Sequence, residues 1–368
     1  MNILALNWQD LSNPQAGGAE VHLEELLRRI VVMGHKVTLF CSGYRGARDE
    51  EEIEGIRIIR RGNRYNFNLI APFHLRKIVR AEKFDVLIED INKIPFYTPF
   101  YLNLKTLVVV PHLFSTSVFK EINFLLGLYI YLSEQPLVRV YRGRKFNVIS
   151  ESTADDMVRK GIPREDISVV HCGIDSTVYS KDDSVGKYDK PTVLYLGRIK
   201  KYKSVDHLLL AYKKILGKIP EARLKIVGSG DYLQPLKDLA AKLDIAARVE
   251  FPGFVSVEEK VATLRRSHVA VYPSLKEGWG LTNIEANSCG TSVVAANVQG
   301  LKDSVVDDKT GYLYEYGNID KLAEKLEKIL LDDDNRRRLE QGGLEWAAKF
   351  SWDNAAEKFL RVLNEVAG

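Results

Sequence analysis

The sequence predicts an α/β protein of two domains, each built on a doubly wound parallel sheet. Three observations predict it. The chain has 368 residues, which is long for a single hydrophobic core and suits two domains of ordinary size. Short apolar runs alternate with segments of helical periodicity, an order that gives parallel sheets with right-handed crossovers. The alternation runs through the chain twice, and a polar, irregular stretch at 172–190 separates the two runs.

The first half opens with an apolar run at 2–7, followed by a loop and a segment at 19–32 with apolar residues at helical spacing. Gly34 ends this helix. The same alternation then continues to residue 170. We expect strands at 36–41, 56–59, 85–89, 106–111, 146–149 and 167–170, and helices at about 69–83 and 118–141.

The second half restarts the pattern. We expect strands at 192–196, 223–227, 249–251, 269–272, 292–295 and 311–314, and helices at about 204–216, 233–243, 257–264, 281–289, 319–331 and 335–349. A capped amphipathic helix follows at about 351–363. We therefore assign an N-terminal domain to 1–172, a second domain to 173–350 and a C-terminal helical segment to 351–368.

The composition is that of a soluble globular protein. The formal net charge of +4 is too small for nucleic acid to be the main partner. Three scattered cysteines, Cys41, Cys172 and Cys289, suit neither a disulfide framework nor a zinc site, which fits a reducing compartment. No signal peptide is evident, and the apolar run at 122–133 is shorter than the ~20 residues that span a bilayer. We expect a cytoplasmic protein.

The most informative stretch follows the strand at 269–272. Its loop, Lys276-Glu277-Gly278-Trp279-Gly280, carries two glycines, which let backbone N–H groups approach a ligand closely. A helix starts directly afterwards at Leu281. The first N–H groups of a helix lack internal partners, and the helix dipole adds partial positive charge there. This segment therefore predicts an anion site of a kind that suits a diphosphate.

Two carboxylates bracket this loop, Glu277 before the helix and Glu285 within it. An ionised carboxylate only accepts hydrogen bonds, so it suits sugar or ribose hydroxyls rather than a phosphate. Together with the anion site, the two acids indicate a nucleotide-sugar site. An ordinary alternative stays open, because Thr282 and Glu285 have the spacing of a capping box that would only close the helix end.

Two more loops follow the first strand of each domain, at the sheet edge where open α/β sheets bind ligands. The first holds Gly17 and Gly18, and its alternative is a tight turn before a helix. The second holds Arg198 and Lys203, a bidentate fork and a mobile charge that suit a diphosphate. Its alternative is a solvated basic turn. His112, after the strand at 106–111, faces the same edge, although a lone histidine there is more often simply packed.

These residues resemble the signature of retaining glycosyltransferase family 4. Glu277 opens Glu-Gly-aromatic-Gly, and Glu285 stands eight positions later, followed by Ala and a small-Cys-Gly-Thr tail. Trp279 stands where Phe is more usual. Gly-Gly-Ala-Glu at 17–20 and Gly-Arg-x4-Lys at 197–203 also fit the family, and the resemblance covers essentially the whole chain. Departures are Thr282 for a common Pro, Ser204 for the Gly that usually follows the Lys, and Cys172 for a usual Asn.

The resemblance implies the GT-B architecture, two facing Rossmann-like domains with the donor held mainly by the second. A C-terminal helix crosses back to the first. The implied reaction moves a hexose-type sugar, with retention, from a nucleoside diphosphate sugar, UDP being the commoner nucleotide, to an acceptor hydroxyl. The product would belong to cell-surface polysaccharide, glycolipid or glycan synthesis. Alternatives on the same fold are a sugar-nucleotide 2-epimerase, a pyridoxal-phosphate phosphorylase and a non-catalytic nucleotide-sugar-binding subunit.

The same resemblance assigns the site residues. The catalytic set is His112, Glu277, Arg198 and Lys203. The donor-binding set is Gly17, Gly18, Arg198, Lys203, Phe254, Glu277, Gly278, Trp279, Gly280, Leu281 and Glu285. No Asp-x-Asp motif is evident, so we expect neither a metal nor a cofactor. Gly228-Ser229-Gly230 looks like a dinucleotide loop, but Leu233 replaces its third glycine and we discount it.

Two stretches suggest contact with an anionic membrane. One carries Arg57, Arg60, Arg61, Arg64, Arg76, Lys77, Arg80 and Lys83 around Leu69, Ile70, Phe73, Leu75 and Ile78. The other is the apolar run at 124–132, followed by Arg139, Arg142, Arg144 and Lys145. Each could equally be a core-facing helix with a solvated basic side. Together they make a lipid-linked acceptor a hypothesis.

Overall fold

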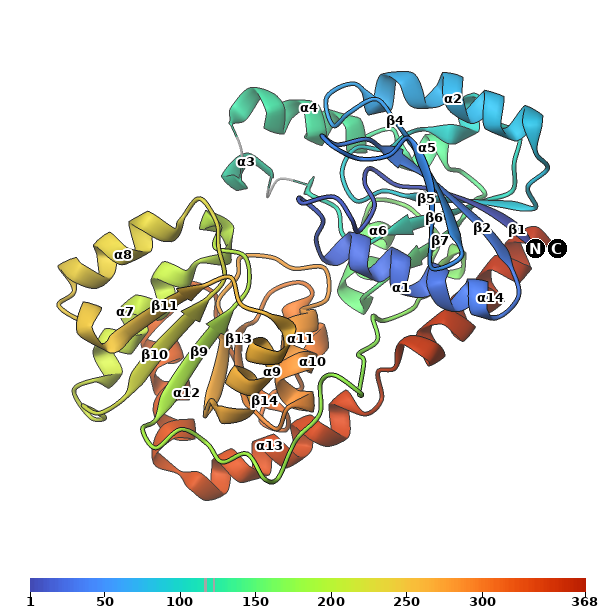
Figure 1. Cartoon of the computed structure of the whole chain (residues 1–368). Helices are drawn as coiled ribbons and strands as arrows, with labels where there is room; N and C mark the ends of the chain where they lie inside the picture. Colours follow the sequence, from blue (N-terminus) through green and yellow to red (C-terminus); the bar gives the residue numbers. More distant parts are fainter. Residues whose placement is uncertain (116–117, 122) are drawn as a thin grey trace. The chain divides into compact units, whose positions relative to one another are not determined.

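The computed structural model of the protein describes residues 1–115, 118–121 and 123–368. These residues form two compact units (Figure 1). Unit 1 contains Met1–Gly173 together with Trp352–Gly368, and unit 2 contains Ile174–Ser351. Each unit holds a mainly parallel sheet with helices packed on it. The predicted fold class is therefore confirmed.

The sheet of unit 1 has eight strands in the order β3-β4-β2-β1-β5-β6-β7-β8. They are β1 (Asn2–Leu6), β2 (Lys36–Ser42), β3 (Glu50–Ile53), β4 (Ile56–Arg61), β5 (Val86–Asp90), β6 (Thr106–Val110), β7 (Lys145–Val148) and β8 (Ile167–Val169). Only β3 runs antiparallel to its neighbour. The sequence did not predict β3, because its glutamates show no apolar alternation. Glu50 pairs instead with Arg57 and Arg61 of β4 across the hairpin (3.3 and 2.5 Å), so charge pairing helps to hold this edge.

The helices of unit 1 are α1 (Gly18–Val32), α2 (Phe67–Ala81), α3 (Val118–Glu121), α4 (Phe124–Glu134), α5 (Leu137–Val140), α6 (Glu151–Arg159) and α14 (Trp352–Ala367). The single helix predicted at 118–141 is wrong, because the chain forms α3, α4 and α5 instead. The side chain of Asn123 caps α4 by accepting from the N–H of Leu126 (3.0 Å). Pro136, which has no N–H, separates α4 from α5.

Unit 2 has a six-stranded parallel sheet in the order β11-β10-β9-β12-β13-β14. Its strands are β9 (Thr192–Leu196), β10 (Arg223–Val227), β11 (Val249–Gly253), β12 (Val269–Tyr272), β13 (Ser292–Ala296) and β14 (Gly311–Tyr314). Its helices are α7 (Val205–Ile215), α8 (Leu233–Lys242), α9 (Val257–Arg266), α10 (Leu281–Ser288), α11 (Leu301–Ser304), α12 (Ile319–Leu331) and α13 (Asp333–Ala347). Apart from the short α11, the sequence predicted each of these elements to within a few residues.

Both sheets contain a point where the strand order reverses. In unit 1 the chain moves from β1 to β2 on one side and later to β5 on the other. In unit 2 it moves from β9 to β10 on one side and later to β12 on the other. Loops that leave adjacent strands in opposite directions open a crevice at the carboxyl ends, where such sheets bind ligands. The loops after β1 and β5, and those after β9 and β12, are therefore the places to look for a site.

Helix α14 packs with unit 1, although its sequence follows unit 2. Its inward face buries Trp352, Phe359 and Leu363 against α1 and strands β5 to β7. Arg29 of α1 donates to Asp353 at the start of α14 (2.6 Å). Helix α14 thus completes the core of unit 1, although the residues that precede it in sequence belong to unit 2.

We predict that Phe359→Ala destabilises unit 1 by about 3–5 kcal/mol, because the ring is fully buried and its loss leaves a cavity. Hydrogen exchange of peptides from β1, β5 and α1 should become faster, while peptides from unit 2 keep their protection. Lys358→Ala, at the exposed neighbouring position, is the control. Equal protection in both variants would show that α14 does not support unit 1.

Two buried glutamates of α1 fix the loop that follows β1. Glu20 accepts from the N–H of Gly17 (2.6 Å) and from the side chains of Gln9 and Asn92 (both 3.1 Å). Glu24 accepts from the N–H of Leu11. Burial raises the pKa of the Glu24 carboxyl to about 7, although the Leu11 N–H opposes part of that shift. The loop is therefore held by two buried acceptors, and burial makes one of them, Glu24, costly to ionise.

Because the folded pKa of Glu24 lies above its ordinary value of 4.5, the folded state binds the extra proton between pH 4.5 and pH 7. Stability is lost as the pH rises through this window. Glu24→Gln removes the group that titrates. The free energy of unfolding of this variant, relative to that of wild type, should therefore rise by about 2–3 kcal/mol from the acidic to the basic end of this pH window. Urea unfolding at several pH values measures this. The control is Glu52→Gln, at an exposed position of β3. Parallel plots of unfolding free energy against pH for wild type and Glu24→Gln would contradict the prediction.

Candidate active site

The loop after β9 is held by close contact between backbones. The N–H groups of Gly197 and Ile199 donate to the carbonyls of Val227 and Ser229 in the loop after β10 (3.0 and 2.9 Å). A Cβ at Gly228 or Gly230 would lie 1.9 Å from the carbonyl oxygen of Gly197 or Ile199. These two glycines are therefore needed so that the loop after β9 can pack against them. This packing role agrees with our discounting Gly228-Ser229-Gly230 as a dinucleotide loop.

Ser204, which follows Lys203, has a φ of +50° and serves as the N-cap of α7. This left-handed conformation explains why glycine is usual at the position in the family that the sequence resembles. The hydroxyl of Ser204 lies 2.9 Å from the hydroxyl of Tyr316, so a buried polar contact accompanies the strained backbone. The departure from the usual residue leaves the loop conformation intact.

The loop after β12 is held by another glycine. Gly300 has a φ of +80°, and a Cβ there would lie 2.2 Å from the carbonyl oxygen of Glu277. The N–H of Glu277 donates to the carbonyl of Gln299 (3.2 Å). Gly280 ends the loop with a φ of +78° and is the N-cap of α10. Backbone contacts therefore fix where Glu277 and the start of α10 lie.

No side chain caps α10, so the capping box that Thr282 and Glu285 could have formed is absent. Oε1 of Glu285 instead accepts from the ammonium of Lys260 on α9 (2.8 Å), and the other carboxylate oxygen lies 2.7 Å from that ammonium as an ion pair. Lys260 also lies 4.9 Å from the centre of the Tyr179 ring. The structural alternative for Glu285 is thus wrong, and no side chain caps the start of α10.

Sequence reasoning missed Lys260. Burial would lower the pKa of its ammonium, but Glu285 and Tyr179 hold it above its ordinary value. One signal was present, because Lys260 falls on the inward face of α9 beside the buried Val261 and Leu264. A lysine in an apolar stripe needs an acidic partner. The sequence did not indicate which acid it would meet.

Lys203 and Glu277 form an ion pair that joins the loops after β9 and β12. Burial alone would lower the pKa of Lys203, but Glu277 raises it, so the lysine stays cationic. Arg198 lies close enough to influence Lys203 electrostatically, and its own side chain is exposed. Two cations, one carboxylate and the start of α10 therefore converge at the strand-order reversal of unit 2.

Two predicted donor-binding residues lie differently from the rest. Trp279 is only 3% exposed, and its ring packs on Phe350 with centroids 5.2 Å apart, so only its backbone can meet a ligand. Phe254 follows β11, the edge strand two places from β9, and is 86% exposed. The side chain of Trp279 thus serves the core of unit 2.

The remaining predicted residues belong to unit 1. Gly17 is the N-cap of α1 and Gly18 is its first residue, and a Cβ at Gly18 would meet nothing within 4 Å. His112 stands two residues after β6 and lies against Phe114, with ring centres 5.0 Å apart. These residues line the carboxyl edge of the sheet of unit 1, as predicted for their positions in the chain.

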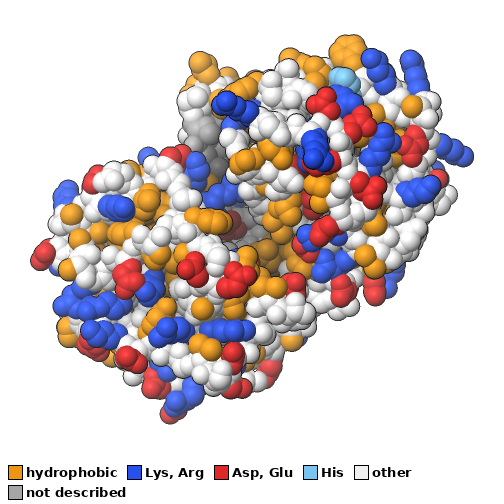
Figure 2. Space-filling view, in the orientation of Figure 1, with side chains coloured by type: hydrophobic (Ala, Val, Ile, Leu, Met, Phe, Trp, Pro, Cys, Tyr) orange, Lys and Arg blue, Asp and Glu red, His pale blue; other side chains and the backbone are white. Residues whose placement is uncertain are grey.

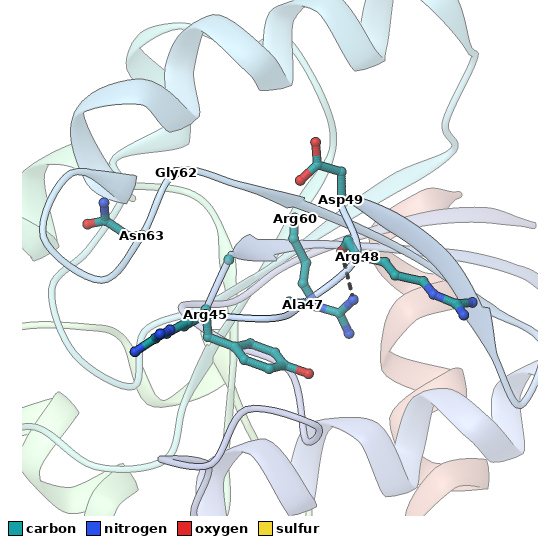
Figure 3. Close-up of a pocket in the computed structure, with 9 residues that line it drawn as sticks. Arg45, Ala47, Arg48, Asp49, Arg60, Gly62 and Asn63 are labelled. Carbon is teal, nitrogen blue, oxygen red and sulfur yellow. Dashed lines mark hydrogen bonds between the residues drawn. The ribbon is translucent and has the colours of Figure 1, made fainter.

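A small pocket of unit 1 lies apart from all predicted site residues (Figure 3). Arg60, at its centre, is buried and pairs with Asp10 and Glu51, and it donates to the carbonyl of Arg48 (3.1 Å). The charge of Arg60 is already balanced, so Arg60 itself is no ready anion ligand. Among the residues that the structure describes, no group of three or more His, Cys, Asp or Glu side chains could hold a metal ion.

Two family models match the chain. The model described as Glycosyltransferase Family 4 matches residues 16–178, and the model described as Glycosyl transferases group 1 matches residues 180–346. An uncharacterized glycosyltransferase of Methanocaldococcus jannaschii is 27% identical, over 94% of this chain and 94% of its own.

A second relative is a GDP-mannose-dependent alpha-(1-6)-phosphatidylinositol monomannoside mannosyltransferase of Mycobacterium tuberculosis, 32% identical over 48% of each chain. The match with that relative thus spans about half of its length. Among solved structures, sucrose-phosphate synthase of Thermosynechococcus elongatus has a TM-score of 0.83 at 20% identity, over 99% of this chain and 98% of its own. With both halves matched by glycosyltransferase models and a GT-B enzyme sharing its fold, the chain belongs to glycosyltransferase family 4.

Proposed function

We propose that this glycosyltransferase moves a hexose-type sugar from a nucleoside diphosphate sugar to an acceptor hydroxyl, with retention at the anomeric carbon. The observation that carries the proposal is the convergence of Arg198, Lys203, Glu277 and the start of α10 at one edge of the sheet in unit 2. Cations and free helix N–H groups bind a diphosphate, and the carboxylate accepts from sugar hydroxyls.

In the proposed reaction the bond between the anomeric carbon and the diphosphate oxygen breaks, and the new bond to the acceptor oxygen forms on the same face. The acceptor proton passes to an oxygen of the departing diphosphate, so no protein nucleophile is needed. Arg198, Lys203 and the backbone at 278–281 stabilise the charge that develops on the diphosphate, which is commonly the largest catalytic term. His112 is proposed to bind the transferred sugar.

Glu285 is proposed to accept hydrogen bonds from the ribose. A carboxylate has about four lone-pair directions, so its two contacts with Lys260 leave capacity for the ribose hydroxyls. Lys260 is then a positioning residue. It also balances a buried acid that would otherwise repel the diphosphate.

We retain UDP as the proposed nucleotide, and GDP is its main rival because one relative is named as GDP-mannose-dependent. The proposed acceptor is a sugar, glycan or lipid-linked hydroxyl. A cytoplasmic location is supported by three cysteines that are buried and free of disulfides. Measuring nucleoside diphosphate release against a panel of UDP and GDP sugars would choose the donor.

We predict that Arg198→Ala/Lys203→Ala lowers nucleotide affinity at least tenfold and sugar transfer at least a hundredfold, because both ground state and transition state lose diphosphate contacts. Calorimetry with the nucleoside diphosphate and a transfer assay measure the two effects. Lys201→Ala, an exposed lysine of the same loop, is the control.

Each alternative function gives its own result in these assays. Isomerised nucleotide sugar without acceptor would identify an epimerase. Nucleotide binding without turnover on any donor would identify a binding subunit. Retention would be read from the anomeric configuration of the product by NMR, and an inverted product would contradict the proposed mechanism.

We also predict that Lys260→Met destabilises unit 2 by about 3–5 kcal/mol, because it leaves the buried Glu285 carboxylate without its partner. Lys260→Met/Glu285→Gln should recover most of that stability, since no charge is left buried. Its nucleotide affinity should nevertheless stay at least tenfold below wild type, because the proposed charged ribose acceptor is gone. Wild-type affinity in the double variant would remove Glu285 from the donor site.

A further inference from the structure

The α2 and α4 side of unit 1 exposes more apolar surface than the rest of the described chain. Of fifteen large hydrophobic side chains that are exposed, nine lie on α2, α4 and the segments beside them. They are Tyr65, Leu69, Phe73, Phe100, Phe124, Leu125, Leu126, Tyr129 and Leu132. Figures 1 and 2 show both helices, and many hydrophobic and basic side chains, along the upper edge of this unit. We call these nine residues the apolar face.

On α2 the apolar residues form two stripes rather than one. Phe67, Ala71 and Leu75 are buried and face the core. Leu69 and Phe73, one turn apart on another side, are 68% and 66% exposed. The inward stripe explains why α2 packs on the sheet, but among the described residues of unit 1 nothing covers the outward stripe.

Helix α4 is apolar almost all round, yet five of its eleven residues are exposed, namely Phe124, Leu125, Leu126, Tyr129 and Leu132. The hydroxyl of Tyr129 accepts from the side chain of Asn68 on α2 (3.2 Å), so the two helices lie side by side. A groove lined by Ile94, Tyr97 and Leu132 runs between them. A helix this apolar is normally buried, so its exposure indicates a cover other than the described residues of unit 1.

Basic side chains surround the apolar face. On α2 the outward side continues from Phe73 into exposed Arg76, Lys77 and Arg80. The acid of α4, Glu134, is turned inward, where it accepts from the N–H groups of Phe114 and Ser115 (2.7 and 2.9 Å). The outer surface therefore combines apolar and cationic side chains with few acids.

The sequence predicts more residues at a membrane contact than the structure exposes on the α2 and α4 side of unit 1. Arg57 and Arg61 pair with Glu50, and Arg60 is buried against Asp10, so these three arginines are occupied elsewhere. Ile70 and Ile78 are half-buried and Leu75 is fully buried, so they belong to the inward side. The basic contribution comes from α2 itself and from the exposed Arg139 and Arg142 beyond α4.

We propose that the apolar face docks on an anionic lipid bilayer, with its aromatic and aliphatic side chains in the interface and its basic side chains at the headgroups. Interfacial helices have this pairing of apolar and cationic surface. Each basic side chain near an anionic surface adds a favourable increment. Within the described ranges, no helix has the length and apolar character to span a bilayer, so the contact is peripheral. The proposal goes beyond sugar transfer and does not depend on the donor.

A second copy of the chain is the other candidate occupant, and the charges argue against it. A two-fold symmetric dimer places each surface against its own copy. Arg76, Lys77 and Arg80 of one copy would then be buried against a surface that is itself cationic and has few acids to pair with them. Like charges at an interface are unfavourable, whereas anionic headgroups match them.

The test is sedimentation of the full chain with phosphatidylcholine vesicles that contain or lack phosphatidylglycerol. Wild type should pellet with the anionic vesicles, and raised salt should weaken the binding. Leu69→Glu/Phe73→Glu and Arg76→Glu/Lys77→Glu should each lower the partition coefficient at least tenfold. The matched controls are Val32→Glu/Leu331→Glu and Lys213→Glu/Lys214→Glu, exposed residues outside the apolar face. The substituted side chains are exposed, so the variants should fold like wild type, which thermal unfolding checks.

Several outcomes would overturn the proposal. Wild type could fail to pellet with anionic vesicles at low salt. The face variants and the controls could pellet equally well. Wild type could form a dimer in light scattering that Leu69→Glu/Phe73→Glu abolishes, without any vesicle binding, and a second copy would then be the occupant.

Discussion

The donor side of this enzyme depends on backbone segments that approach one another more closely than a side chain would allow. Because Gly228 and Gly230 have no Cβ, the backbone of the loop after β9 can pack against them. Gly300 allows the same close contact with the loop after β12. Loops held by their backbones can present side chains at fixed positions without a large hydrophobic contact of their own. These glycines contact no ligand in our proposal. They nevertheless determine the positions of Arg198, Lys203 and Glu277.

Charge pairing solves a second difficulty at the same site. A diphosphate site that also needs carboxylates for hydroxyl groups places like charges together. Here each acid has its own lysine, Lys203 for Glu277 and Lys260 for Glu285. The pairs balance the charge of both acids, and they leave lone pairs free for hydroxyl donors. The exposed Arg198 adds a further cation beside Lys203, and in our proposal both contact the diphosphate.

What the sequence could predict was local. Apolar periodicity placed nearly every strand and helix, and the spacing from Glu277 to Glu285 indicated the donor segment. The misses depend on partners distant in sequence: β3 is held by arginines of β4, and Lys260 finds Glu285 through packing of α9 on α10. Pattern alone also could not show that Trp279 faces Phe350 rather than the ligand. We expected one helix at 118–141. Within that range, Asn123 and Pro136 are the residues that could have indicated that the helix is interrupted.

Helix α2 shows why periodicity identifies an amphipathic helix but not its surroundings. Both of its apolar stripes repeat every four residues, one through Phe67, Ala71 and Leu75 and one through Leu69 and Phe73. Only the sheet decides which stripe the core accepts. The stripe left outside costs solvation free energy in water wherever it stays uncovered, and folding of unit 1 recovers none of that cost. A surface of this kind is retained at no loss when its working environment is less polar than water, and in our proposal the flanking cations match that environment to an anionic bilayer.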